Sequence, residues 1–484
     1  MAAAQGNCPS CGAPIEFSVG SSISKVCEYC RHTVLRSDRG LTELGKVSDL
    51  TDVPSLIAVG DEGTLAGRPF RVMGRVQLDH GKGPWDEYYV AFDYGQSWGW
   101  LAFAQGRWFT TSPVAGVAVP PFGALSPEAE VMLGAAGRFR VAEVRTGRIV
   151  SAEGELPGAF PAGFERAYAD LAGANSAFAT LDYGDQSQPP IVFLGWEFPE
   201  SALSVTQLGP RSANKVRVTA LKCPNCGGDV PALLPGRSER LGCPYCGAVS
   251  DIAGRTVIAQ QEKARSLPVI PIGTRGSLDG VDYISIAALR RGSYFEGELY
   301  EWEEFLLWSQ GVGFRWLVLD PETGWSFVTP VNLAELDFTE RPFAVSYVGR
   351  RFEQRNQNRA RVLYVLGEVY WKCEVGETVE VSDFTAGSDV LSREASATEV
   401  NWSLSQALSW AKVAQAFNLS LAEHARHAGK AKKSSFIAPG TLLLIIAVVV
   451  ILCIVIASAP SGPSYGGGVG VGSYRGGGVF SGGK

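Results

Sequence analysis

Four Cys-x-x-Cys turns, arranged as two pairs, constrain the fold of this chain more than any other feature. The first pair is Cys8-Pro9-Ser10-Cys11 and Cys27-Glu28-Tyr29-Cys30, and the second is Cys223-Pro224-Asn225-Cys226 and Cys243-Pro244-Tyr245-Cys246. This spacing is typical of zinc ribbons, in which two turns present four thiolates to one ion. The sequence therefore predicts two structural zinc ions, one held by each pair of turns, with the coordination sphere closed to substrate. His32, two residues after Cys30, is an alternative ligand.

Charge and cysteine usage restrict the class of protein. The chain of 484 residues carries 49 acidic against 43 basic side chains, a net charge of −6, which argues against a nucleic-acid partner. Eight of its ten cysteines fall in the paired turns, leaving only Cys373 and Cys453. That usage is typical of metal-binding thiols in a reducing compartment.

A long apolar segment near the C-terminus predicts attachment to a membrane. Residues 437–459 are almost wholly apolar, and as a helix this segment is long enough to cross a hydrocarbon core about 30 Å thick. A buried core helix is the alternative. The basic residues Lys430, Lys432 and Lys433 precede the segment, which places the bulk of the chain on the cytoplasmic side of a single span. Residues 460–484 form a glycine-rich tail that we expect to be disordered and outside.

Between the cysteine pairs and the apolar segment, short aromatic and β-branched runs alternate with turn residues, which favours antiparallel β-structure. The second half repeats the first at an offset of about 215 residues, as a tandem duplication does. The predicted fold is mainly β: two units of zinc ribbon plus a sandwich-like or barrel-like domain, then one transmembrane helix. The predicted boundaries are 1–39 and 217–256 for the ribbons, 40–210 and 262–428 for the β-rich domains, and 404–421 for an amphipathic helix closing the second domain.

The two halves share motifs that resemble a known bacterial family, domain of unknown function 4178. The shared motifs are Trp85-Asp86-Glu87-Tyr88 with Trp302-Glu303-Glu304-Phe305, Trp100-Leu101 with Trp316-Leu317, Gly154-Glu155 with Gly367-Glu368, and the closing Trp402-Ser403-Leu404. The first copy departs from the pattern where Leu194-Gly195-Trp196-Glu197 replaces the closing motif. The resemblance implies two β-rich cytoplasmic modules of a kind often found behind zinc ribbons and sometimes anchored to a membrane, and it implies no particular activity. With the apolar segment, we expect attachment to the bacterial inner membrane.

The acids found in both copies are the main candidates for a function. They are Glu87, Glu155, Glu304 and Glu368, and the accompanying aromatic candidates are Trp316 and Trp325. We expect the two acids of each copy to lie on different strands with solvated tips, which favours a non-enzymatic, membrane-anchored adaptor that binds other proteins. The alternative is a small-molecule sensor or an enzyme that uses a cleft lined by acids and aromatics.

Overall fold

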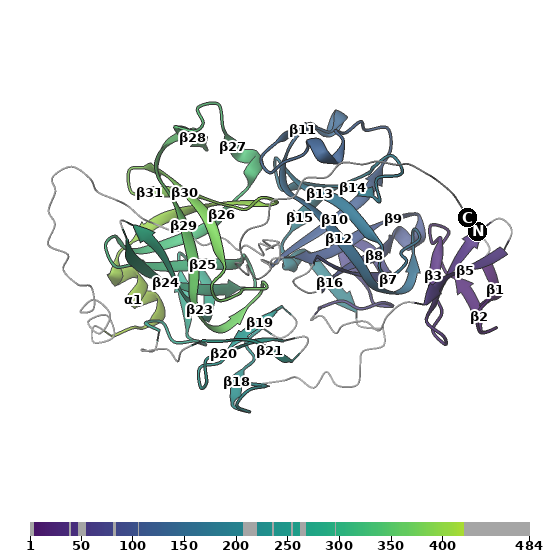
Figure 1. Cartoon of the computed structure of the whole chain (residues 1–484), viewed down its shortest axis with the longest axis horizontal. Helices are drawn as coiled ribbons and strands as arrows, with labels where there is room; N and C mark the ends of the chain where they lie inside the picture. The colour runs from purple at the N-terminus through teal and green to yellow at the C-terminus, as the bar shows by residue number, and fades with distance from the viewer. Residues whose placement is uncertain are drawn as a thin grey trace, which may run out of the picture.

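The computed structural model describes residues 4–37, 40–46, 55–80, 84–104, 106–206, 220–234, 237–252, 255–261, 268–295 and 297–420. These residues form mainly β-structure in two similar halves, here called copy 1 (residues 4–206) and copy 2 (residues 220–420), which lie side by side in Figure 1. The predicted span at 437–459 and the tail at 460–484 lie outside the described residues. Within the described part of the chain, no helix has the length and apolar character needed to cross a membrane.

Copy 1 begins with a small ribbon, at the right of Figure 1. Its strands are β1 (Ala4–Asn7), β2 (Pro14–Phe17), β3 (Ser24–Val26), β4 (His32–Ser37) and β5 (Gly40–Lys46). The strands that follow are β6 (Glu62–Leu65), β7 (Arg68–Asp79), β8 (Pro84–Phe92), β9 (Ser97–Ala104), β10 (Arg107–Val114), β11 (Glu130–Met132), β12 (Arg138–Leu156), β13 (Glu165–Gly173), β14 (Ala177–Gly184), β15 (Ile191–Phe198) and β16 (Leu203–Thr206). Single turns of 3₁₀ helix lie at Asp93–Gly95, Phe122–Ala124, Gly134–Ala136 and Glu200–Ala202.

Eight strands of copy 1 close into a barrel. The order around it is β7-β8-β9-β10-β15-β14-β13-β12, and β12 pairs back onto β7. Closure depends on the length of β12, whose first half pairs with β13 and whose second half pairs with β7. The two strands meet closely at Gly74 and Gly154. A Cβ atom at Gly74 would lie 1.9 Å from the Glu155 carbonyl oxygen, so only glycine fits there.

Copy 2 repeats this arrangement. Its ribbon strands are β17 (Ala220–Lys222), β18 (Asp229–Pro231), β19 (Arg240–Gly242), β20 (Ala248–Asp251) and β21 (Thr256–Gln260). The later strands are β22 (Arg275–Leu278), β23 (Val281–Phe295), β24 (Glu298–Ser309), β25 (Gly313–Asp320), β26 (Gly324–Val331), β27 (Leu336–Asp337), β28 (Ala344–Tyr347), β29 (Arg350–Val369), β30 (Thr378–Ala386), β31 (Asp389–Ala395) and β32 (Val400–Leu408), with a 3₁₀ turn at Leu333–Glu335. The ring β23-β24-β25-β26-β32-β31-β30-β29 closes where β29 pairs with β23.

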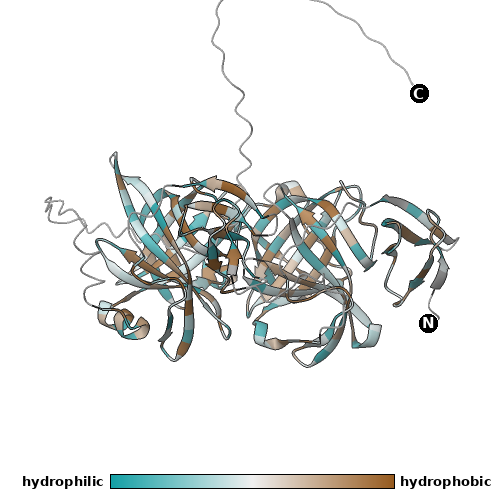
Figure 2. Ribbon diagram, turned by 90° about the horizontal axis from the view of Figure 1, so that it is seen from below, coloured by the Kyte–Doolittle hydropathy of each residue, from teal (hydrophilic) through white to brown (hydrophobic). Residues whose placement is uncertain are grey.

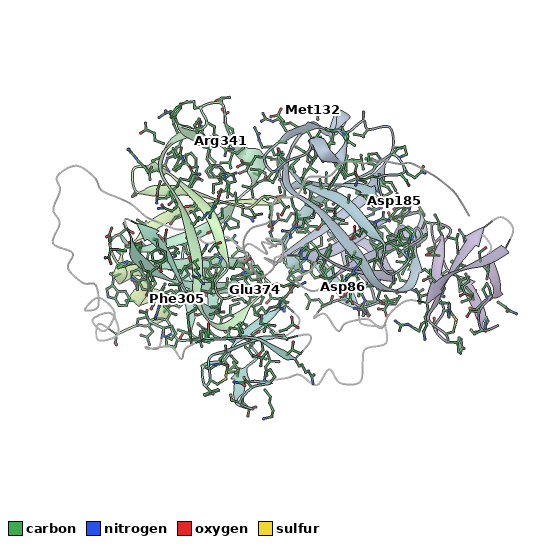
Figure 3. The ribbon with its side chains drawn as sticks, viewed as in Figure 1. Asp86, Met132, Asp185, Phe305, Arg341 and Glu374 are labelled. Atoms are coloured by element: carbon green, nitrogen blue, oxygen red, sulfur yellow. The ribbon has the colours of Figure 1, made fainter. Side chains whose placement is uncertain are left out.

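Alternation along the strands gives each barrel an inner and an outer apolar face, visible as changing hydropathy along the strands in Figure 2. In β24, Trp302 and Leu306 pack inside the barrel, whereas Phe305 packs outside. The outer face around Phe305, labelled in Figure 3, is covered by helix α1 (Trp410–Phe417) through Val413 and Phe417. A second outer cluster, around Trp402, lies beneath β27 and β28.

The predicted amphipathic helix is shorter than expected. The apolar spacing indicated a helix from residue 404, but residues 404–408 complete strand β32, which pairs with β26 and β31. Helix α1 begins only after Ser409, whose side chain accepts a hydrogen bond from the Lys412 N–H at 3.2 Å as an N-cap. The prediction was therefore wrong for 404–408, because strand pairing with two neighbours outweighs a short helical periodicity.

The two copies contact each other through backbone and charged groups. The Val144 N–H donates to the Thr398 carbonyl at 2.8 Å, beside an antiparallel bridge between Glu143 and Glu399. The guanidinium of Arg145 lies 2.7 Å from the Glu399 carboxylate, and both side chains are buried. These contacts join strand β12 of copy 1 to the residues just before strand β32 of copy 2.

Candidate functional sites

The cysteines of each ribbon converge as the spacing predicts. In both groups of four, the sulfur atoms all lie within 4.8 Å of one another. The sulfur–sulfur distances include 3.6 Å for Cys8 and Cys30, 3.7 Å for Cys11 and Cys27, 3.6 Å for Cys223 and Cys246, and 3.8 Å for Cys226 and Cys243. Each group could hold a metal ion.

The turns that carry these cysteines have a shared backbone geometry. The Gly12 N–H donates to the Cys8 carbonyl at 2.8 Å, and Gly12 adopts a φ of +76°, which glycine tolerates without strain. Gly227 repeats this geometry in the second ribbon, with a bond to the Cys223 carbonyl at 2.8 Å. His32, the alternative ligand, is engaged elsewhere, because its ring nitrogens lie 3.2 Å from the Cys30 carbonyl and 3.2 Å from the Glu43 carboxylate.

Glu155 and Glu368 join each ribbon to its barrel. The Glu155 carboxylate accepts a hydrogen bond from the Ser18 N–H at 2.8 Å and lies 3.8 Å from the ammonium of Lys25. In copy 2, the buried Glu368 carboxylate accepts from the Leu233 N–H, from the Leu234 N–H at 3.3 Å, and from the Ser238 hydroxyl at 2.7 Å. Burial nevertheless raises the pKa of Glu368. These two acids bind the ribbon backbone and are committed to structure.

Glu87 and Glu304 instead point into the barrels. Each follows a tryptophan by two residues, so both side chains of the pair face inward on one strand. The indole N–H of Trp85 donates to the Glu87 carboxylate at 3.4 Å, and that of Trp302 donates to Glu304 at 2.6 Å. The Trp-acid-Glu motif of the two copies therefore encodes an inward carboxylate held by an indole.

In copy 2 the inward carboxylate belongs to a closed, fully buried cluster. The Arg291 guanidinium lies 2.7 Å from Glu394 and 3.7 Å from Glu304. Asp383, beside them, accepts from the Ser392 hydroxyl at 2.5 Å. Burial raises the pKa of Glu304 to about 8 and that of Asp383 to about 8, despite these partners.

In copy 1 the inward carboxylate lines a cavity of about 450 Å³, here called the lumen. Three further acids of copy 1, Glu143, Asp170 and Asp182, and the cations Arg107 and Arg166 also line it. Its aromatic walls include Trp85, Trp98, Trp100, Phe160, Tyr168 and Phe193. Copy 2 completes the lining with Glu239, Lys372, Glu399, Val400 and Asn401. A volume and a lining of this kind suit a small organic ligand.

The charges of the lumen differ in how they are satisfied. Arg166 pairs with Asp182, and the Thr180 hydroxyl donates to Asp170 at 2.7 Å. Burial, with the nearby charge of Asp170, raises the pKa of Glu87 to about 7. Burial also raises the pKa of Asp170 to about 6. Both shifts mean that ionised carboxylates are poorly compensated in this cavity.

The expectation that the four acids have solvated tips was wrong. Glu155, Glu304 and Glu368 are buried, and Glu87 is half-buried against the lumen. Strand alternation with apolar neighbours turns them into the protein, where indole, hydroxyl and backbone donors compensate part of their charge. The other part of the expectation is confirmed, because Glu87 and Glu155 lie on strands β8 and β12, and Glu304 and Glu368 lie on strands β24 and β29.

Trp316 and Trp325 do not share a cleft. Trp316 packs inside the second barrel and contacts Trp371 at a ring separation of 5.4 Å. Trp325 packs outside it, against Phe305 and α1. The sequence analysis missed Asp170, Asp182 and Arg166. A detectable signal was the alternation of polar with apolar residues along 166–171 and along 179–182, which places Arg166, Asp170 and Asp182 on one face.

A ribbon with four cysteines, joined to an eight-stranded barrel and repeated once, defines a tandem ribbon-and-barrel protein. The family model described as Domain of unknown function (DUF4178) matches residues 58–200 and 271–409, more than half of the chain. The chain belongs to this family, with two tandem copies, which confirms the resemblance seen in its motifs. No curated protein and no solved structure matches the chain.

Proposed function

We propose that this protein binds a small organic molecule in the lumen of copy 1 and acts as a membrane-anchored sensor rather than as an enzyme. The lumen is the observation that carries this proposal, because it combines about 450 Å³ of space with aromatic walls and a few polar groups. Both copies supply its lining, so occupancy can change the contact between them. A protein adaptor, the function that the sequence favoured first, has no need of a cavity lined by aromatic and acidic side chains inside a barrel.

The two ribbons take a structural part in the proposal, with zinc as the metal. Zinc–sulfur bonds of about 2.3 Å in a tetrahedron place the sulfurs about 3.8 Å apart. The closest sulfur pairs, at 3.6 to 3.8 Å, fit that geometry. Four cysteines leave no position for substrate, so the metal would stabilise the ribbon and, through Glu155 and Glu368, the barrel above it.

Membrane attachment rests on the sequence. The uncharged apolar run at 441–457 and the lysines before it support one span in the bacterial inner membrane, with the barrels in the cytoplasm and the glycine-rich tail outside. A sensor in this position would present its lumen to cytoplasmic molecules.

Ligand binding in the lumen can be tested with indole, a small aromatic molecule that carries no charge of its own. Ala102 faces the lumen from β9, opposite Glu87, so Ala102→Trp should fill the space without touching the ribbon. The matched control is Thr206→Trp, at the exposed end of β16. Ligand-observed NMR of the full chain in lipid nanodiscs should show saturation transfer to indole for the wild type and the control, and a loss for Ala102→Trp. Equal transfer in all three proteins would contradict the proposal.

A further inference from the structure

The two barrels carry the same three acids at equivalent positions. Glu87 lies between Val76 and Ala102 in the sheet, and Glu304 lies between Leu289 and Val318. The other two pairs are Asp170 with Asp383, each accepting from a hydroxyl on the next strand, and Asp182 with Glu394, each two residues after that hydroxyl. Since the acids correspond, the two barrels can be compared by the groups that neutralise them.

Copy 2 neutralises its acids with an internal cation. Arg291 stands on β23 opposite Trp302, and its guanidinium contacts both Glu394 and Glu304. The equivalent position in copy 1, on β7 opposite Trp85, is Leu78. Copy 1 therefore lacks a cation at the place where copy 2 holds one.

The cations around the lumen form ion pairs with acids other than Glu87 and Asp170. Arg166 on β13, where copy 2 has Val379, pairs with Asp182. Arg107 lies 3.2 Å from Glu197, Arg145 pairs with Glu143 and Glu399, and Lys372 of copy 2 lies 3.7 Å from Glu239. Among the described ion pairs none includes Glu87 or Asp170, and burial raises the pKa of both. Within the described part of the chain, these two carboxylates of the lumen thus lie outside any ion pair and feel nearby arginines only at longer range.

We infer that the lumen of copy 1 binds an organic cation, an ammonium or guanidinium group on an apolar body, beside Glu87 and Asp170, the two lumen acids outside the described ion pairs. The inference rests on the proposed ligand-binding function and names the class of its ligand. The cation would contact Glu87 and Asp170, while Trp85, Trp98 and Trp100 would surround the body and attract the charge through their ring faces.

A metal ion fits this cavity less well than an organic cation. In the described part of the chain, the side chains whose ligand atoms gather closely enough for a metal are the two cysteine groups, and the lumen acids are not among them. The space of about 450 Å³ also far exceeds a single ion. A molecule that carries its charge on an apolar body fills the space and reaches the acids together.

Three probes of one shape separate charge from size: tryptamine, which is cationic, tryptophol, which is neutral, and indole-3-acetate, which is anionic. Isothermal titration calorimetry of the full chain in nanodiscs should give tryptamine at least about tenfold tighter binding than tryptophol, and indole-3-acetate the weakest. Glu87→Gln should weaken tryptamine about tenfold and leave tryptophol unchanged. Glu165→Gln, an exposed acid on β13, is the matched control and should change neither.

Leu78→Arg provides a second, independent test. It gives copy 1 the internal cation of copy 2, so it should abolish tryptamine binding. The equivalent position of copy 2 holds an arginine inside a barrel of the same topology. Tryptamine no tighter than tryptophol in a lumen that still binds indole would overturn the cation and leave the proposed function standing. Indole binding that ignores Ala102→Trp would overturn the proposed function itself. Tryptamine binding unchanged by Glu87→Gln and by Leu78→Arg would place the cation outside the lumen and refute the inference.

Discussion

The contact between the copies depends on Glu128, and its removal should separate them. Glu128 belongs to copy 1, but the partners of its buried carboxylate come from copy 2. Arg393 donates two bonds at 2.8 and 3.0 Å, Arg341, labelled in Figure 3, donates one at 2.6 Å, and the Trp402 indole donates one at 2.9 Å. Glu128→Ala leaves both guanidinium groups and the indole N–H without this acceptor.

The magnitude follows from how well these groups are shielded. Removing one partner of a buried, hydrogen-bonded ion pair costs about 3–5 kcal/mol. The side chains of Arg341 and Arg393 are 30% and 18% exposed, so water recovers part of that cost. We therefore expect a loss of about 3 kcal/mol in the free energy that holds the copies together.

Hydrogen exchange with mass spectrometry measures this loss locally. In Glu128→Ala, peptides around the Val144 N–H and Thr398, which form the backbone bond between the copies, should exchange about 100-fold faster than in the wild type. The control is Glu130→Gln, whose 45% exposed carboxylate should contribute below about 1 kcal/mol. Equal exchange in both variants would refute the assignment of this contact to Glu128.

The same contact should weaken in acid. Burial alone would raise the pKa of Glu128, but the hydrogen bonds and charges of Arg393 and Arg341 hold it below its ordinary value of 4.5. A lowered pKa means stabilisation that is present above pH 4.5 and lost as the pH falls through the lowered value. The difference in exchange between wild type and Glu128→Ala should therefore shrink below pH 4.5.

Three further outcomes are expected. Cys226→Ser should unfold the second ribbon and reduce the zinc content, measured by elemental analysis, from two atoms per chain to one. Fewer than one zinc atom per wild-type chain would contradict the proposal of two zinc sites. Glu368→Gln should weaken the bonds from Leu234 and Ser238 by about 2 kcal/mol and speed exchange in the ribbon strands, without an effect on the first ribbon. Protease added to intact spheroplasts should leave residues 1–430 uncut, and digestion of the barrels would reverse the proposed topology.

The sequence was sufficient for the parts of the fold that depend on local spacing. The cysteine turns and the repeat at about 215 residues predicted two ribbons and two β-rich modules, and the structure and the family match confirm this repeat. Barrel closure depends on pairing between β7 and β12, which lie some 70 residues apart in the chain. No local pattern specifies such a long-range pairing, so the sequence left sandwich and barrel open.

The candidate acids show what a repeat can and cannot reveal. Retention in both copies selected Glu87 and Glu304, which face the barrel interiors, together with Glu155 and Glu368, which bind the ribbon instead. Retention alone does not separate these roles, because both need a carboxylate at a fixed place. Burial was misjudged for the same four acids, because a charged side chain on a strand is exposed more often than not.

The differences between the copies explain why the lumen needs both of them. Copy 2 places Arg291 among its own acids, where the guanidinium contacts Glu304 and Glu394. The barrel of copy 2 packs against that of copy 1, and its residues Lys372 and Asn401 line the lumen of copy 1. Glu239, which precedes strand β19 of the second ribbon, lines the lumen as well and lies 3.7 Å from Lys372.

A single copy would leave that side of the lumen open to water, which weakens the attraction between a carboxylate and a bound cation. The cation inside copy 2 and the contact of copy 2 with copy 1 thus leave copy 1 with an acidic cavity that both copies line.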